Sequence, residues 1–204
     1  MFSVSNLSCA RGDKRLFSGV SFTLESGQWL HLEGDNGVGK TSLLRLVCGL
    51  ASVEDGVISW NNQPVAQNPE AFRADLAYLG HQLALKEDLT PLENLQAEAA
   101  VSRRDLSKAD ALKALAQLGL RGKEHLPVRV LSQGQKRRSA LARLLVSKAK
   151  LWVLDEPFVA LDGAAQNALS EVINGHLANQ GMVLLTSHQA VSLGGQGFSY
   201  RLAA

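Results

Sequence analysis

The sequence predicts an α/β protein with a mixed sheet core, an antiparallel β subdomain and an inserted helical subdomain. Three observations support this prediction. A glycine-rich stretch at 34–42 has the spacing of a phosphate-binding loop. Two apolar runs, 151–154 and 182–186, are typical of strands buried on both faces of a parallel sheet. The pattern is β-rich from 4 to 58 and changes to helical signals over 83–131.

The composition is that of an ordinary folded protein, with 204 residues of which 46% are hydrophobic and 20% charged. We expect a single domain over 1–204 with subdomains. The net charge of +2 is too mild to indicate nucleic-acid binding, so no nucleic-acid partner is expected. Cys9 and Cys48 lack metal-type spacing and indicate free thiols. The first residues lack the pattern of a signal peptide and no long apolar run occurs in the sequence, so we expect any membrane role to depend on a partner.

The first strands are expected to form an antiparallel sheet beside the loop. Residues 21–24 alternate between polar and apolar side chains, and 25–27 form a turn before a strand at 28–32. A further strand is predicted at 57–60.

The loop lies between the strand at 28–32 and an amphipathic helix at 41–48, the context that a phosphate-binding loop requires. Its glycines let the backbone curl, so that successive N–H groups turn towards an anion. Lys40 adds a positive charge for the outer phosphates, and Thr41 is placed to ligate Mg²⁺. We therefore expect the loop to bind a nucleotide with Mg²⁺. Its residues, in order, are Gly34, Asp35, Asn36, Gly37, Val38, Gly39, Lys40, Thr41 and Ser42.

Helical signals begin after a short apolar strand at 76–80. Thr90 and Glu93 fit a capping box with proline at the first helical position, and Ser107 repeats this logic. A helical subdomain is therefore predicted over roughly 83–131.

A third helix is predicted to start at Ser132, and a fourth at about 164–177. A serine-capped start that contains a glycine offers free N–H groups and a favourable dipole to a phosphate, yet nothing in its own chain obviously needs them. Lys136, Arg137 and Arg138 follow in the first turns, either as a solvated face or as a contact for an anion or headgroup. The start of this helix consists of Ser132, Gln133, Gly134 and Gln135.

Two acids follow the strand at 151–154, at the edge where open α/β sheets bind ligands. Asp155 is expected to hold Mg²⁺ through its water shell, and Glu156 is expected to act as the general base, unless it is a solvated loop carboxylate. His188 follows the strand at 182–186 and is either a contact for the γ-phosphate or a surface histidine.

Together these motifs resemble those of the ATP-binding subunits of ABC transporters. Residues 131–135 look like the signature motif, and Gln82, 159–162 and His188 look like the Q-loop, the D-loop and the switch histidine, in the family's order. The resemblance covers essentially the whole chain. It implies a P-loop NTPase of ABC type that hydrolyses ATP with Mg²⁺.

The resemblance also implies a head-to-tail pair of ATPase subunits. The helix that starts at Ser132 in one copy would close on the ATP held by Lys40 of the other, with Asp162 in the D-loop. The implied catalytic residues are Glu156, His188 and Lys40, and the implied metal ligands are Thr41, Gln82 and Asp155.

Two positions depart from the family's pattern. Gln133 stands where a small residue is usual, and Arg11, before Gly12, stands where an aromatic ring usually stacks on adenine. Because arginine can also stack on a base, we expect Arg11 to contact adenine.

Within the family, four segments resemble the haem-exporter branch that serves cytochrome c maturation. That resemblance implies a peripheral subunit at the cytoplasmic face of the inner membrane with a polytopic membrane partner. ATP turnover would drive haem export or the release of a haem-loaded chaperone. The segments are 16–22, 80–82, 92–95 and 151–158.

Other functions compete with this one. The chain could serve another small-molecule ABC transporter, or be a soluble ABC ATPase of DNA repair or translation, although those members usually carry a coiled-coil insertion or two modules. A nucleotide-dependent switch is the third option, but the Asn-Lys-x-Asp element of GTP switches is absent from the sequence.

The segment at 81–94 begins at the Q-loop position and could move when ATP binds. Leu83, Leu85 and Leu89 are apolar residues in this loop. They either receive the cytoplasmic coupling helices of a membrane partner, as in relatives, or anchor the helical subdomain.

Overall fold

The computed structural model describes residues 1–12 and 14–203, which divide into two compact units. The first unit takes the described residues of 1–80, 148–157 and 173–203. The second takes 81–147 and 158–172, and helix α6 (Gly163–Ala178) contributes residues to both. The organisation of 1–204 as one ATPase domain with an inserted subdomain stays a prediction.

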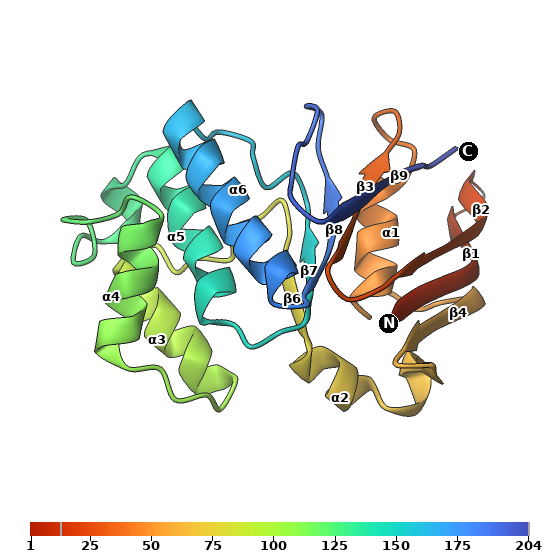
Figure 1. The fold of residues 1–204 in the computed structure, drawn as a ribbon, viewed down its shortest axis with the longest axis horizontal. Helices are drawn as coiled ribbons and strands as arrows, with labels where there is room; N and C mark the ends of the chain where they lie inside the picture. Colours follow the sequence, from red (N-terminus) through yellow and green to blue (C-terminus); the bar gives the residue numbers. More distant parts are fainter. Residues whose placement is uncertain (13, 204) are drawn as a thin grey trace. The chain divides into compact units, whose positions relative to one another are not determined.

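The described strands of the first unit form two sheets (Figure 1). One is antiparallel, in the order β2-β1-β4-β5, and the other has only parallel pairings, in the order β6-β7-β8-β3-β9. The α/β prediction with a separate antiparallel sheet is therefore confirmed. The strands are β1 (Phe2–Arg11), β2 (Lys14–Leu24), β3 (Gln28–Glu33), β4 (Asp55–Trp60), β5 (Gln63–Pro64), β6 (Leu76–Leu79), β7 (Leu151–Leu154), β8 (Met182–Thr186) and β9 (Gln196–Arg201).

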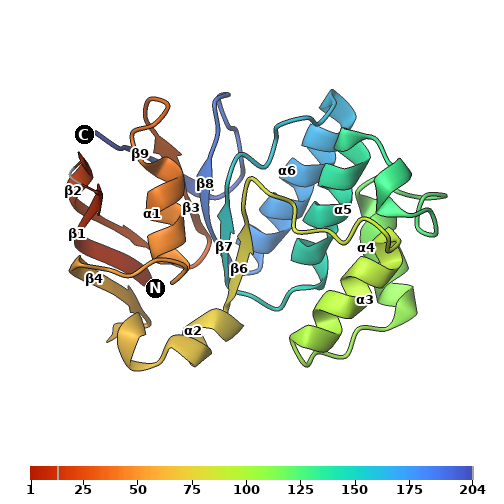
Figure 2. The same cartoon turned by 180° about the vertical axis from the view of Figure 1, so that it is seen from behind.

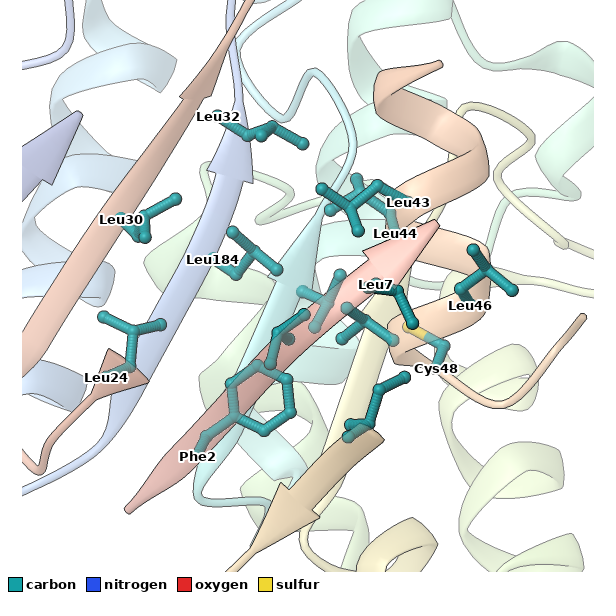
Figure 3. Close-up of a cluster of buried hydrophobic side chains, with 14 of the residues drawn as sticks. Phe2, Leu7, Leu24, Leu30, Leu32, Leu43, Leu44, Leu46, Cys48 and Leu184 are labelled. Carbon is teal, nitrogen blue, oxygen red and sulfur yellow. The ribbon is translucent and has the colours of Figure 1, made fainter. Parts of the chain in front are cut away.

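Helix α1 (Lys40–Val47) lies between the two sheets, as Figure 2 shows. Its buried residues recur at helical spacing and form an apolar face, which packs in one core with residues of both sheets. Each fully buried leucine contributes about 1.5–3 kcal/mol through the apolar area it removes from water. This core fixes the loop that precedes α1 against both sheets. Figure 3 shows its members Phe2, Leu7, Leu24, Leu30, Leu32, Leu43, Leu44, Leu46, Cys48 and Leu184.

Neither β9 nor helix α2 (Pro69–Ala74) was expected from the sequence. β9 pairs in parallel with β3 at the edge of the sheet, and most of its residues are exposed, so no apolar run marks it. Helix α2 is short, but Asn68 accepts a hydrogen bond from the N–H of Ala71 and proline occupies its first turn. That capping pattern is visible in the sequence.

The second unit is helical, with α3 (Pro91–Val101), α4 (Lys108–Gln117) and α5 (Gln133–Val146) packed against one another. The predicted helix starts at Thr90 and Ser107 are confirmed, with a capping box at Thr90. Glu93 donates its N–H to Thr90 Oγ1 at 3.1 Å, and the N–H of Thr90 donates back to Glu93 Oε2 at 2.8 Å. Ser107 caps α4 by accepting the N–H of Asp110. Short 3-10 turns occupy Val65–Gln67 in the first unit and Val128–Val130 in the second.

Candidate active site

The loop at 34–42 has a backbone that only glycine permits at two points. Gly34 has φ +145°, and a Cβ there would lie 2.8 Å from the carbonyl oxygen of Leu202 and 2.9 Å from Val38 Cγ1. Gly39 has φ +110° at the start of α1, and a Cβ there would lie 3.0 Å from the ring of Phe17. The antiparallel sheet therefore backs the loop through β2, and the glycines let the backbone pass this close.

Lys40 folds back over the loop from which it comes. Its ammonium donates to the carbonyl oxygen of Gly34 at 2.6 Å and to that of Asp35 at 3.2 Å. The first helical bond, from the N–H of Leu43 to the carbonyl oxygen of Gly39, measures 2.8 Å. The loop, this cation and the N-terminus of α1 thus place positive potential at one point, which suits a phosphate. The exposed residues of the loop are Asp35, Asn36, Gly37 and Thr41, and Val38 and Ser42 are half-buried.

Asp155 joins the loop to the parallel sheet. It is 3% exposed, and its Oδ2 accepts a 3.0 Å hydrogen bond from the hydroxyl of Thr41. A hydroxyl and a carboxylate side by side are the oxygen ligands that Mg²⁺ takes beside a substrate phosphate. The donor set therefore fits Mg²⁺. Gln82 lies exposed in the second unit, so its role as a further ligand stays a prediction.

Thr186 at the end of β8 connects the two acids. Its hydroxyl donates to Asp155 Oδ1 at 2.8 Å and accepts the backbone N–H of Glu156 at 2.9 Å. Glu156 has φ +52°, a left-handed conformation that is uncommon for a residue with a side chain. The hydroxyl of Thr186 therefore helps to hold the backbone of Glu156 in this strained conformation.

His188 lies next to that carboxylate. Its backbone N–H donates to Glu156 Oε2 at 3.2 Å, and its ring Nε2 lies 3.5 Å from Glu156 Oε1. The Glu156 side chain is 13% exposed and that of His188 57%. His188 is thus a surface residue that also contacts Glu156, and its contact with the γ-phosphate stays a prediction. The solvated-carboxylate interpretation is wrong for Glu156.

Two acidic groups around Asp155 are kept neutral. Burial raises the pKa of the Tyr78 hydroxyl to about 12, helped by the Asp155 carboxylate and opposed by Arg45. Burial, and then Asp155, also raises the pKa of the Cys48 thiol. A buried thiol that keeps its proton is unreactive, so Cys48 is an inert core residue. It is a free cysteine, as predicted.

The second unit holds the signature residues. Ser132 accepts the N–H of Gln135 at 3.3 Å and donates its own N–H to Gln135 Oε1 at 3.0 Å, which closes a capping box at α5. A Cβ on Gly134 would lie 3.0 Å from the carbonyl oxygen of Ala160. The D-loop backbone therefore runs against the start of α5. Asp162 caps α6 by accepting the N–H of Ala165 at 2.8 Å, and Gln133 is exposed.

The basic residues after the signature do not form a solvated face, so that interpretation is wrong. Lys136 pairs with Glu87 at 2.8 Å, and Arg137 is buried. Arg138 donates to the carbonyl oxygen of Gly119 at 3.2 Å, at the end of α4. Lys136 and Arg138 are therefore held by residues of the second unit, and no pattern in the sequence shows these partners.

Arg11 ends β1 and is exposed, at the hairpin that leads into β2. It pairs in register with Lys14. Since Phe17 of the same β2 backs Gly39, the antiparallel sheet carries Arg11 and supports the loop.

Residues 17–159 match the model of the ABC transporter family. The match covers more than half of the chain, which therefore belongs to the ABC transporter family. The class of protein that the fold and the site define is an ABC-type ATPase, a P-loop NTPase that binds ATP.

Two curated relatives of this chain belong to one branch of the family, the CcmA proteins. The chain is 53% identical to the cytochrome c biogenesis ATP-binding export protein CcmA of Dechloromonas aromatica (strain RCB), over 95% of both chains. It is 51% identical to CcmA of Albidiferax ferrireducens (strain ATCC BAA-621 / DSM 15236 / T118), over 94% of this chain and 91% of that relative.

Solved structures agree on the fold. The ATP-binding subunit of an ABC transporter aligns with a TM-score of 0.82 at 29% identity, over 92% of this chain and 79% of that one. The dimeric structure of MJ0796, a bacterial ABC transporter cassette, aligns with a TM-score of 0.81 at 22% identity, over 93% and 88%. Within the described ranges, no helix has the length and apolar character needed to cross a membrane.

Proposed function

We propose that this chain is the ATP-hydrolysing subunit of an ABC transporter complex in c-type cytochrome biogenesis, where turnover drives haem export or the release of a haem-loaded chaperone. One observation carries the proposal. The loop of Lys40 and the acids Asp155 and Glu156 meet through the Thr41–Asp155 hydrogen bond in a chain that is 53% identical to a CcmA protein.

ATP would be held by the loop at 34–42, with Lys40 against its outer phosphates and Arg11 stacked on adenine. Thr41, Asp155 and Gln82 would hold Mg²⁺, which supplies charge neutralisation at the phosphates when bound. For hydrolysis, Glu156 would orient the attacking water and take its proton. Its contact with His188 favours this role, because the same histidine could reach towards the γ-phosphate.

The active form would be a head-to-tail pair with a second copy. The start of α5 from Ser132 to Gln135 would close on the ATP held by Lys40 of the other copy, and the D-loop with Asp162 would lie beside it. The contact of Gly134 with Ala160 supports this proposal, because it joins the signature and the D-loop in one surface. The MJ0796 cassette, which has this fold, is dimeric.

A polytopic CcmB-like membrane subunit is the proposed second partner, at the cytoplasmic face of the inner membrane. The second unit has a groove of about 180 Å³ that would receive it, and Val101 on its rim is 85% exposed. Leu85 lines the groove, while Leu83 and Leu89 are half-buried nearby in the chain. The groove is lined by Ala84, Leu85, Lys86, Asn94, Ala97, Glu98, Val101 and Arg143.

Two experiments test the proposal. In cells that depend on this gene, Lys40→Ala should abolish both ATP binding and holocytochrome c formation, whereas Lys113→Ala, an exposed lysine of α4, should leave both unchanged. Normal assembly of c-type cytochromes with Lys40→Ala would refute the pathway. Normal ATP affinity in an equilibrium titration would refute the site.

The membrane contact is tested separately. Leu85→Glu should remove the protein from detergent-solubilised membrane complexes while ATP binding is retained, and Leu126→Glu, at an exposed leucine of the same unit, should not. Retention of Leu85→Glu in the complex would show that the groove is not the contact.

A further inference from the structure

His31 of β3 is a buried histidine beside the candidate active site. It is 8% exposed, and it lies on the face of β3 opposite to Leu30 and Leu32, which point into the core around α1 (Figure 3). Its ring Nε2 lies 3.1 Å from the carbonyl oxygen of Ser187. Because a carbonyl oxygen can only accept, Nε2 carries the proton and donates.

The other side of the ring faces a carboxylate. Nδ1 of His31 lies 3.4 Å from Glu33 Oε1, which is an ion pair only when the ring is protonated, and the hydroxyl of Ser199 on β9 donates to the same oxygen at 2.8 Å. The imidazole thus lies between the end of β8 and a carboxylate held by β3 and β9, two neighbouring strands of the parallel sheet. In this position the ring directs its Nε2–H at the end of β8.

The carbonyl that His31 binds belongs to the same peptide group as the N–H of His188. That N–H donates to Glu156 Oε2 at 3.2 Å. A hydrogen bond accepted at the oxygen of a peptide group polarises the group and strengthens the donor at its nitrogen. His31 is therefore connected to the carboxylate of Glu156 through the Ser187–His188 peptide group.

We propose that His31 is a positioning residue for ATP hydrolysis, which holds the Ser187–His188 peptide so that its N–H orients the carboxylate of Glu156. This inference rests on the proposed function, in which Glu156 is the base. Without the Nε2 donor, the peptide loses the hydrogen bond at its oxygen, so its N–H orients Glu156 less well while the phosphate loop is untouched. The effect should therefore fall on kcat and leave KM for ATP unchanged.

Two amide substitutions of His31 distinguish the roles of its two ring nitrogens. In His31→Gln the amide nitrogen can take the place of Nε2 and still donate to Ser187. In His31→Asn the shorter amide takes the place of Nδ1 and cannot reach it. We expect kcat of the purified full-length protein to fall about five- to tenfold in His31→Asn, with KM unchanged, and to stay near wild type in His31→Gln.

A double-mutant cycle with Glu156→Gln provides the decisive readout, after thermal unfolding has shown that the variants are folded. If His31 acts through Glu156, then His31→Asn lowers the residual rate of Glu156→Gln little further. A full additional loss in the double variant, equal losses in the Asn and Gln variants, or no loss in His31→Asn would each overturn the inference. If Glu156→Gln itself hydrolyses ATP at the wild-type rate, the proposed role of Glu156 fails first.

Discussion

The hydroxyl of Thr186 donates a 2.8 Å hydrogen bond to Asp155 Oδ1 while it accepts the backbone N–H of Glu156. Thr186 is fully buried. One hydroxyl thus links the carboxylate that would hold Mg²⁺ to the backbone of the residue that would act as the base. Asp155 also accepts a hydrogen bond from the hydroxyl of Thr41, so the loop, β7 and β8 meet at this carboxylate.

Thr186→Val should therefore impair catalysis and stability together. Valine keeps the volume but removes both hydrogen bonds, which should lower kcat about 10- to 100-fold and the free energy of unfolding by about 1–3 kcal/mol. Denaturant unfolding and steady-state ATPase assays measure the two effects. Thr186→Ser keeps the hydroxyl and should lose little kcat. An unimpaired Thr186→Val would show that this hydroxyl does not organise the site.

Much of the site was predictable because its residues follow simple rules of spacing. The glycines at 34, 37 and 39, and the two acids after the apolar run of β7, point to the phosphate end of an α/β sheet without any contact being known. The helix starts at Thr90 and Ser132 were predictable for a similar reason, because a capping box is a local interaction.

The remainder depends on contacts between residues far apart in the sequence. Thr186 and His31 appear in the sequence only as strand residues, and nothing local shows that they meet Asp155 and Ser187. β9 escapes prediction because an edge strand with exposed side chains has no hydrophobic period. The solvated-face prediction is wrong for Arg137 because its basic neighbours suggest exposure, whereas the fold buries it.

Gly134→Ala tests whether the signature and the D-loop need their close approach. The added Cβ would lie 3.0 Å from the carbonyl oxygen of Ala160, so one of the two must shift by a few tenths of an ångström. We expect a severalfold lower rate of ATP hydrolysis with ATP affinity unchanged. Gly175→Ala, a glycine within α6 with open space around it, is the matched control and should stabilise the protein by about 0.5–1 kcal/mol. A wild-type rate in Gly134→Ala would show that this contact tolerates a side chain.

His176 should make stability depend on pH. Its ring stacks on Trp152 with centroids 3.7 Å apart, and burial lowers the pKa of His176, opposed by the backbone of Met182 and Lys150. Above the unfolded-state pKa of 6.5 the ring is neutral in both states. As the pH falls below that value, the unfolded chain binds a proton that the folded chain resists, so stability is lost towards the folded-state pKa.

The check is urea unfolding at a series of pH values. His176→Phe keeps an aromatic ring on Trp152 but cannot titrate, so its stability should fall less between neutral and mildly acidic pH than that of the wild type. His125→Gln, at an exposed histidine, should behave as the wild type does. Equal pH dependence in His176→Phe and wild type would exclude His176 as the source.

The rate of ATP hydrolysis by Glu156→Gln tests the central claim most directly. Glutamine preserves the shape of the side chain but cannot take the proton of the attacking water. We predict a rate lower by roughly 10²–10⁴-fold, with ATP affinity unchanged and an ATP-bound pair of subunits that accumulates in analytical ultracentrifugation. Hydrolysis by Glu156→Gln at the wild-type rate would contradict the assignment of Glu156 as the base.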